Sequence, residues 1–572
     1  MSLLAVKSQY AQHLAGNILV AISEFVLTLD SGWDDFMHLL CLCLELTIFN
    51  ILTSSTEPGA PEGRLLDYDP SILIVLPKLK LKRANWSIVA AIIRVLRNIQ
   101  KFLKQDSDDQ IMKTYLDSVS SLMLNLPGDV LYEIYVGHNT ETLKGLGKDV
   151  LQAKILQWKE ITVFFGNFIQ FLCSLVTQIS FPADEVGLSP VICKIINLVP
   201  RLAAWCHANL QSLRHVRITQ YFRHKVLMLM IKLSSSIHVE QTILITWIHL
   251  IHSYFEDLLL QPVSGGNLDH DGLLEDSPFR TSIFDPGKQN NFCCHLQRLT
   301  VFLFLKCSLN LVNMKGSPDE AQCSYDNLKH DCTADLNLDS ECSSRNVGLA
   351  ELHKWIQAHI PADILANNEL YFERCVQFTL SFLQLFMHED DILFEMLLQL
   401  FRIPSYLDHQ IIKDKSLAEV RNRPVFLAPD LFNPIHLFHL FLAEIHYDHQ
   451  VLLDYLISKD TGSRCAEYLL RSLRSVCDSW NLFVEFPGVD GLDQSCTKRQ
   501  KILIHCKDFR GVSYPASSKD SINYRPPFFA ARDCLVSLRT SIDSLNQKNL
   551  FPYNPQVLLQ RLMRFQDLCD KL

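Results

Sequence analysis

Apolar residues recur three or four positions apart along most of this chain, which is the spacing that one face of an α-helix requires. Polar residues, Pro and Gly interrupt the pattern at short intervals. In the first part of the chain we predict helices at residues 9–29, 33–51, 85–103, 108–124, 149–179, 190–213, 215–236 and 239–259. A loop rich in Pro and Gly is expected at 54–70. Residues 1–260 are thus predicted to form an N-terminal helical solenoid.

Two irregular regions interrupt the later helices. The first covers residues 261–348, and its acidic part, 316–348, cannot bury enough apolar surface to order itself, so we expect a disordered insert there. The second, residues 486–528, contains several glycines and a Pro-Pro pair and predicts a linker. Helical patterns occupy 349–485 between the two regions, and 529–572 at the C-terminal end.

The clearest pair of helices lies between His446 and Trp480. Asp448 can cap the first helix, on which one side is formed by Leu452, Leu453, Leu456 and Ile457. Gly462 can take the left-handed conformation that often ends a helix, and Ser463 can cap the next one. The apolar stripe of that second helix consists of Cys465, Tyr468, Leu469, Ser472, Leu473, Val476 and Trp480. We expect an antiparallel pair with a wide apolar seam.

These residues resemble the Lines family. The similarity lies in LLDYLISKDTG followed by CAEYLLRSLR, and in a second block near the end of the chain, KNLFPYNPQVLLQRLMRF. The regions 349–485 and 529–572 are therefore interpreted as Lines-like. The positions that carry the similarity, as structural or partner-binding residues, are Leu453, Tyr455, Leu456, Gly462, Tyr468, Leu469, Trp480, Phe551, Pro552, Tyr553, Asn554 and Pro555.

The resemblance implies a non-enzymatic protein of developmental signalling of the Wnt/Wingless type and of transcriptional regulation, found in the cytoplasm, the nucleus or both. No catalytic residues define the family, so none are assigned here. The expected partners are other proteins.

Composition supports a fold of helices packed on helices. Of 572 residues 48% are hydrophobic, while only 20 are glycine, about half the usual share of roughly 7%. Sheet-rich folds with many tight turns and glycine-loop nucleotide enzymes are therefore disfavoured. We predict an all-α, irregular armadillo/HEAT-like solenoid with disordered inserts. An irregular helical bundle is the alternative.

Charge and cysteine usage limit the partners and the compartment. The net charge of −9 would repel phosphate on average, so direct binding of nucleic acid is not expected. Eighteen cysteines without a signal peptide point to a reducing compartment, where thiols pack as small hydrophobes. Residues 161–181 lack charge but carry polar side chains, and 36–52 is short and contains His38 and Glu45. We expect no membrane span.

No motif for chemistry stands out. The sequence contains no CxxC, HExxH, GxSxG or phosphate-loop pattern. His436 and His439 lie one turn apart but lack further ligands at fixed spacing, so they are interpreted as seam histidines. Pairs of acidic residues fall at helix starts, where they favour the positive end of the helix dipole. We expect no cofactor, no metal and no small-molecule substrate. The alternatives are an enzyme with a site built from remote residues, or a membrane-associated helical protein.

Overall fold

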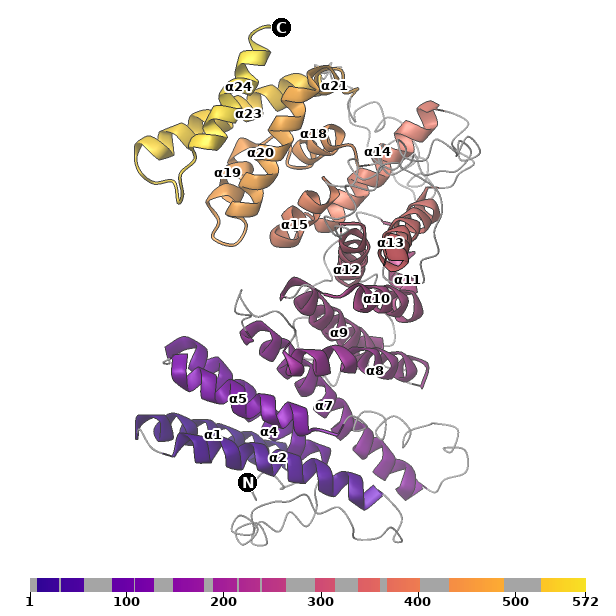
Figure 1. Ribbon diagram of the computed structural model, residues 1–572, viewed down its shortest axis with the longest axis vertical. Coiled ribbons are helices and arrows are strands. Elements are labelled where there is room, and N and C mark those ends of the chain that lie inside the picture. Colours follow the sequence, from indigo (N-terminus) through magenta and orange to yellow (C-terminus); the bar gives the residue numbers. More distant parts are fainter. Residues whose placement is uncertain are drawn as a thin grey trace, which may run out of the picture. The chain divides into compact units, whose positions relative to one another are not determined.

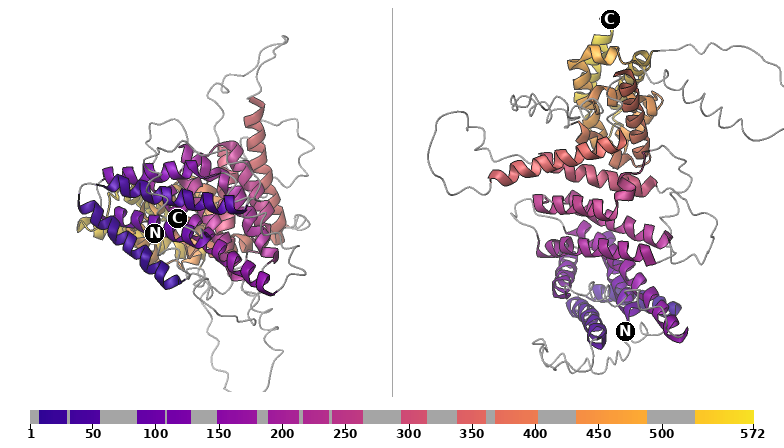
Figure 2. Two further views of the ribbon diagram at one scale, coloured as in Figure 1. Left: turned by 90° about the horizontal axis from the view of Figure 1, so that it is seen from below. Right: turned by 90° about the vertical axis from the view of Figure 1, so that its right-hand side faces the viewer.

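The computed structural model describes residues 8–29, 32–55, 85–106, 109–127, 148–179, 189–212, 216–236, 239–263, 294–313, 338–360, 368–401, 432–487 and 526–572. These ranges contain nineteen α-helices and no strand (Figures 1 and 2). The predicted all-α class is confirmed. The chain divides into two compact units, and the boundary between them runs through helices α10 and α12.

Unit 1 is built mainly from the N-terminal helices, which match the predicted ranges to within a few residues. They are α1 (Gln9–Thr28), α2 (Trp33–Ser55), α4 (Trp86–Asp106), α5 (Asp109–Asn125), α7 (Lys148–Gln178), α8 (Pro190–Ser212) and α9 (Val216–Ser236). Helices α1, α4, α7 and α9 pack in that order as one layer, and α2, α5 and α8 form a second. Two layers of successive helices are the arrangement of a helical solenoid.

Large aromatic side chains join the layers of unit 1. The Trp86 ring of α4 lies 4.7 Å from that of Phe164 in α7, and the adjacent Phe165 stacks on Trp205 of α8 at 3.8 Å. Trp205 in turn meets the edge of Phe222 in α9 at 5.0 Å. Because each helix buries one side against the previous helix and another against the next, the helices look apolar almost all round in the sequence.

Helices α10 (Gln241–Tyr254), α11 (Glu256–Leu259) and α12 (Cys294–Asn313) follow, the first and last of them shared between the units. Unit 2 then contains α13 (Leu338–His359), α14 (Asn368–Phe386), α15 (Asp390–Leu400), α18 (Pro434–Glu444), α19 (His449–Ile457), α20 (Gly462–Asp478), α21 (Trp480–Val484), α23 (Pro527–Gln547) and α24 (Gln556–Cys569). Helix α20 lies at its centre, in contact with α15, α18, α19, α21 and α24.

The predicted end of the acidic insert at residue 348 is wrong. Helix α13 begins at Leu338, so residues 338–348 are helical, and the described part of the helix packs tightly at Gly348. A Cβ added to Gly348 would lie 2.7 Å from the Ser308 carbonyl oxygen in α12. Glycine therefore allows two helices to approach closely here, whereas the sequence suggested that it marked a boundary. Residues 264–293, 314–337 and 488–525, which cover most of the predicted insert and linker, lie outside the described residues.

The linker also ends earlier than predicted. Helix α23 begins at Pro527, and Phe528 is buried, so its side chain belongs to the core of unit 2. A Pro in the first turn suits a helix start because its missing N–H has no helical partner there. The Pro-Pro pair thus starts a helix within the region that was assigned to the linker.

Two helices are long and apolar enough to cross a membrane by length and composition. They are the segments Trp33–Thr53 in α2 and Gln157–Gln178 in α7, of which 44% and 67% are buried within the protein. The α7 segment is mostly enclosed by its neighbours, which is the expected property of a core helix in a solenoid. The criterion is weak evidence for a span, because such core helices also satisfy it.

Candidate interaction surface at the C-terminal helices

The pair of helices predicted around residue 460 is formed by α19 and α20. The Asp448 carboxylate accepts a hydrogen bond of 2.8 Å from the Gln450 amide and caps α19, as predicted. Leu452, Leu453 and Leu456 are buried in the seam. Ile457 was placed on the same side, but its side chain is 42% exposed, because α19 ends there and the chain turns away from the core.

Gly462 has a different role from the one predicted. It is the first residue of α20, and the predicted left-handed conformation is absent at this position. A Cβ here would lie 2.5 Å from the Leu456 carbonyl oxygen, so the glycine allows α20 to begin directly against the end of α19. The predicted capping by Ser463 is also wrong. Thr461 occupies the cap position, and its hydroxyl donates instead to the Tyr455 carbonyl at 3.0 Å.

Tyr553 links the two sequence blocks in space. Its hydroxyl lies 3.1 Å from the Leu456 carbonyl oxygen and 3.4 Å from that of Gly462, so it can donate to either. The carbonyl of Leu456 belongs to the last turn of α19, where the helix itself offers no partner. Burial raises the pKa of the Tyr553 hydroxyl, which therefore stays a neutral donor. Tyr553 and Leu456, 97 positions apart in the chain, thus satisfy each other's donor and acceptor.

The other residues of the connection between α23 and α24 support this arrangement. The half-buried Phe551 ring meets Tyr553 edge-on at 4.9 Å. Pro552 and Asn554 are exposed, and the Asn554 side chain accepts a hydrogen bond of 3.0 Å from the amide of Gln556, the first residue of α24. Pro555 is buried just before that helix.

The sequence analysis placed Trp480 on the same helix as Tyr468, but the structure does not. Helix α20 ends at Asp478, and Trp480 opens the short helix α21 with its ring only partly buried. The ring packs edge-on against Phe528 at 5.9 Å and Phe565 at 5.7 Å. Trp480 therefore joins the two family blocks through contacts among three helices, α21, α23 and α24.

The remaining predicted positions form the interior of this region. Tyr468 and Leu469 are fully buried on α20, and Tyr468 is surrounded by the rings of Phe394, Phe401, Phe438 and Phe441. Tyr455 is half-buried and meets Phe394 at 5.1 Å. The structure thus assigns a packing role to these positions, and their part in binding a partner stays a prediction.

Four exposed apolar side chains lie in or directly beside the two segments that Tyr553 joins. We call the group the C-terminal apolar surface and define it as Ile457, Leu550, Tyr553 and Val557, which are between 36% and 66% exposed. Ile457 follows Leu456, which Tyr553 contacts, while Leu550 and Val557 flank Tyr553 in the chain. The sequence analysis missed Leu550 and Val557. The position of Val557 on the side of α24 away from its buried leucines was the signal that could have indicated it.

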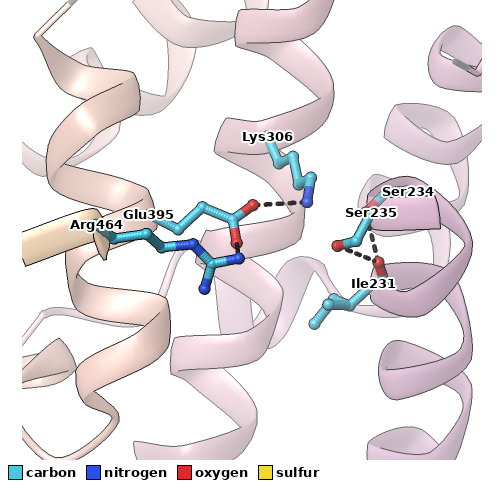
Figure 3. Close-up of polar contacts among 6 residues, drawn as sticks. All are labelled: Ile231, Ser234, Ser235, Lys306, Glu395 and Arg464. Carbon is cyan, nitrogen blue, oxygen red and sulfur yellow. Dashed lines mark hydrogen bonds and ion pairs between the residues drawn. The ribbon is translucent and has the colours of Figure 1, made fainter. Parts of the chain in front are cut away.

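A charged cluster connects helices α12, α15 and α20 (Figure 3). The buried Lys306 ammonium of α12 lies 2.7 Å from Glu395 of α15, whose other carboxylate oxygen is 3.7 Å from Arg464 of α20. The carboxylate therefore connects three helices. Because Lys306 is almost fully removed from water, its charge depends on this partner far more than an exposed lysine would.

The buried histidine and cysteine side chains among the described residues contribute to packing. His439 is fully buried, its Nε2 lies 2.8 Å from the Phe483 carbonyl, and burial lowers its pKa to about 4. Nine of the twelve described cysteines are buried, and burial raises the thiol pKa values of seven of these, to about 11 for Cys173 and about 12 for Cys307. Raised thiol pKa values oppose nucleophilic reactivity at neutral pH.

The described ranges hold no candidate metal cluster, and one cavity in unit 1 is small. They contain no group of three or more His, Cys, Asp or Glu side chains placed to bind an ion. A cavity of about 20 Å³ in unit 1, lined by apolar side chains and Lys194, has room for little more than one water molecule. The Lys194 ammonium donates to the Leu124 and Leu126 carbonyls at 2.6 Å each and so completes the end of α5.

Comparison with known proteins identifies both parts of this region. A family model described as Lines N-terminus matches residues 335–486, and one described as Lines C-terminus matches residues 531–567. No curated protein matches the chain. A solved structure, described as a circular tandem repeat protein with novel repeat topology and enhanced subunit contact surfaces, aligns over 98% of this chain and 96% of its own, with 11% identity and a TM-score of 0.26. That likeness is too low to support an argument. The two family regions, which together make up about a third of the chain, occur in the expected order and contain the contacts between α19, α20, α21 and the α23–α24 connection, and over these regions the chain matches the Lines family.

Proposed function

We propose that this protein is a non-enzymatic helical scaffold that binds another protein through the C-terminal apolar surface. The observation that carries the proposal is the exposure of Ile457, Leu550 and Val557 around a connection fixed by Tyr553. Grouped apolar side chains that remain exposed on a rigid base are typical of protein-binding surfaces. The fold supports the same function, because stacked helices present extended surfaces to other chains.

The chemistry of the surface favours an apolar segment as partner. Its four defining side chains are aliphatic or aromatic, and the exposed Lys459 and Asp460 stand beside Ile457 with opposite charges. An amphipathic helix could place apolar residues one turn apart on this surface and polar residues on the rim. A strongly acidic or basic segment would find no surplus of the opposite charge here.

The match of two regions to the Lines family supports the finer proposal that the scaffold acts in developmental signalling of the Wnt/Wingless type and in transcription, in cytoplasm and nucleus. Its test is a transcriptional reporter for that pathway in cells that lack the protein and are complemented with the full chain. Restored reporter output supports the proposal. Unchanged output in the presence and absence of the protein would reject it and leave the scaffold proposal in place.

Binding is tested with Leu550→Glu and Val557→Glu in the full chain. Proximity labelling of the wild type should define a reproducible set of neighbouring proteins, and the two variants should lose the same members at equal expression. Met563→Glu is the matched control, because Met563 is also exposed on α24 but lies on another side of that helix. Equal loss in the control, or no loss in the two variants, would exclude this surface as the binding site.

The enzyme alternative would need an accessible reactive group, whereas His439 and nine of the twelve described cysteines are buried. The membrane alternative rests on α2, whose apolar segment is less than half buried. Extraction of cell membranes at alkaline pH tests it: retention of the chain in the membrane pellet would favour a span over a scaffold in solution.

A further inference from the structure

Helix α1 exposes a continuous apolar stripe along its entire length. The stripe consists of Tyr10, Leu14, Ile18, Ile22, Phe25 and Leu29, the last directly after the helix, and their side chains are between 42% and 76% exposed. Successive members are three or four residues apart, so they lie one above the other on one side of the helix. The exposed positions beside them are His13, Asn17, Ala21 and Thr28, so the side carries no acidic residue, Lys or Arg.

The opposite side of α1 is already engaged within unit 1. Ala15 and Ser23 are buried, and α1 packs against α2 and α4. At Gly16 an added Cβ would be 3.5 Å from the Arg94 side chain of α4, so the two helices are in close contact. The stripe is therefore a second apolar side, beyond the one that the fold of unit 1 requires.

We propose that the stripe is the interface of a homodimer, in which α1 of one copy packs antiparallel against α1 of a second copy. A two-fold axis near the middle of the stripe, between Ile18 and Ile22, brings residues at equal distances from it together. Leu14 of each copy then faces Phe25 of the other, Tyr10 faces Leu29, and the two isoleucines fill the centre. A patch that pairs with itself in this way is what an isologous interface requires.

The size of the stripe suits a stable dimer. From the exposed fractions of the six side chains, each copy offers on the order of 600 Å², or roughly 1,200 Å² for the pair, which is the lower limit of specific interfaces. Neighbouring residues at the rim would add to this area. An apolar patch of this extent lies at the upper end of what monomeric proteins expose, and such patches often mark an interaction site.

The lack of charge selects the second copy over other occupants. Helices that lie on membranes carry Lys or Arg beside their apolar side, and α1 contains neither. A highly charged peptide would meet no opposite charge, because Glu24 is the only Asp, Glu, Lys or Arg of α1 and is partly buried. A second α1 presents the same uncharged surface and leaves no charge unpaired.

The first test is the mass of the full chain in solution, measured by sedimentation equilibrium and by light scattering over a range of micromolar concentrations. The wild type should be a dimer, and Ile18→Glu should be a monomer with unchanged helicity, because Ile18 is exposed within each copy. Leu39→Glu is the control, since Leu39 is similarly exposed on α2 but lies outside the stripe. A monomeric wild type, or a dimer that persists in Ile18→Glu, would overturn the proposal.

The second test addresses the antiparallel register. Leu14→Lys and Phe25→Glu should each reduce dimer formation, whereas the double variant should restore it, because each lysine then faces a glutamate of the other copy. Restoration should weaken in high salt. A double variant that remains monomeric would reject this register, and a wild type that stays monomeric but binds neutral or anionic vesicles would replace the dimer with a lipid surface. Val557→Glu should leave the dimer intact, so this proposal and the scaffold proposal fail independently.

Discussion

The hydroxyl of Tyr553 donates a hydrogen bond to the carbonyl oxygen of Leu456 across a distance of 3.1 Å. The contact joins the connection between α23 and α24 to the end of α19, and the same hydroxyl lies 3.4 Å from the Gly462 carbonyl. Two short blocks that stand far apart in the sequence therefore form one packed region.

Tyr553→Phe removes this hydroxyl and leaves the ring in place. We expect the free energy of unfolding to fall by about 1 kcal/mol, the usual net value of one intramolecular hydrogen bond, with no change in helix content. Urea unfolding followed by circular dichroism measures it. Tyr10→Phe is the control, since Tyr10 is highly exposed on α1. Equal stability of Tyr553→Phe and the wild type would show that water replaces the bond at no cost.

Gly462→Ala should be strongly destabilising. The new methyl group would lie 2.5 Å from the Leu456 carbonyl oxygen, so α19 and α20 must move apart, and we expect a loss of about 2–3 kcal/mol in unfolding free energy. Gly16→Ala is the matched control, because its Cβ meets only ordinary contacts within a helix and should stabilise by up to about 1 kcal/mol. If both variants were equally stable, the close approach to the Leu456 carbonyl oxygen would not be the reason for glycine at position 462.

These two positions show what the sequence could and could not predict. The helices and the buried leucines of α19 follow from local spacing, so their limits were predicted closely, as for α8 at 190–212. Gly462 was correctly selected but misinterpreted, because its role depends on the carbonyl of Leu456 and not on its own backbone conformation. The exposure of Val557 depends on which neighbours cover α24. Such contacts between remote segments leave no periodic signal in one sequence.

The ion pair between Lys306 and Glu395 should matter most when only one partner is removed. Glu395→Ala leaves the buried ammonium without its carboxylate, and we expect a loss of about 3 kcal/mol in unfolding free energy. The double variant Lys306→Met and Glu395→Met replaces both charges by apolar groups and should recover most of it. Thermal unfolding of the two variants and the wild type makes the comparison. A double variant as unstable as Glu395→Ala would contradict the buried-charge explanation.

Trp480→Ala should lower the unfolding free energy by about 2–3 kcal/mol, less than a fully buried tryptophan, because the ring is only partly covered. The loss arises from the contacts with Phe528 and Phe565, which hold α23 and α24 against α21. Leu482→Ala, at an exposed position of α21, should change stability by less than about 0.5 kcal/mol. Melting curves of both variants measure the two losses of stability. Similar losses would mean that the contacts of Trp480 with Phe528 and Phe565 contribute no particular stability.

His439 should make the protein less stable in mild acid. In the folded protein its Nε2 donates to the Phe483 carbonyl and both ring faces are covered by Phe483 and Phe486, so a second proton on Nδ1 would be buried without an acceptor. Its pKa is about 4 in the folded state and about 6.5 in the unfolded chain, where water solvates the charge. Between these values the unfolded state binds more protons, so the unfolding free energy is full above pH 6.5 and falls as the pH drops towards 4.

The contribution of His439 over that window should be about 3 kcal/mol, from the difference between the two pKa values. His439→Phe isolates it, because a phenyl ring preserves the stacking and cannot titrate. The variant loses the hydrogen bond to Phe483 and should be less stable at pH 7, yet its unfolding free energy should fall less than that of the wild type between pH 6.5 and 4. His436 is partly buried, burial lowers its pKa, and it remains in both proteins, so it cancels in the comparison. Parallel stability curves for the two proteins across this pH range would show that His439 does not set the acid sensitivity.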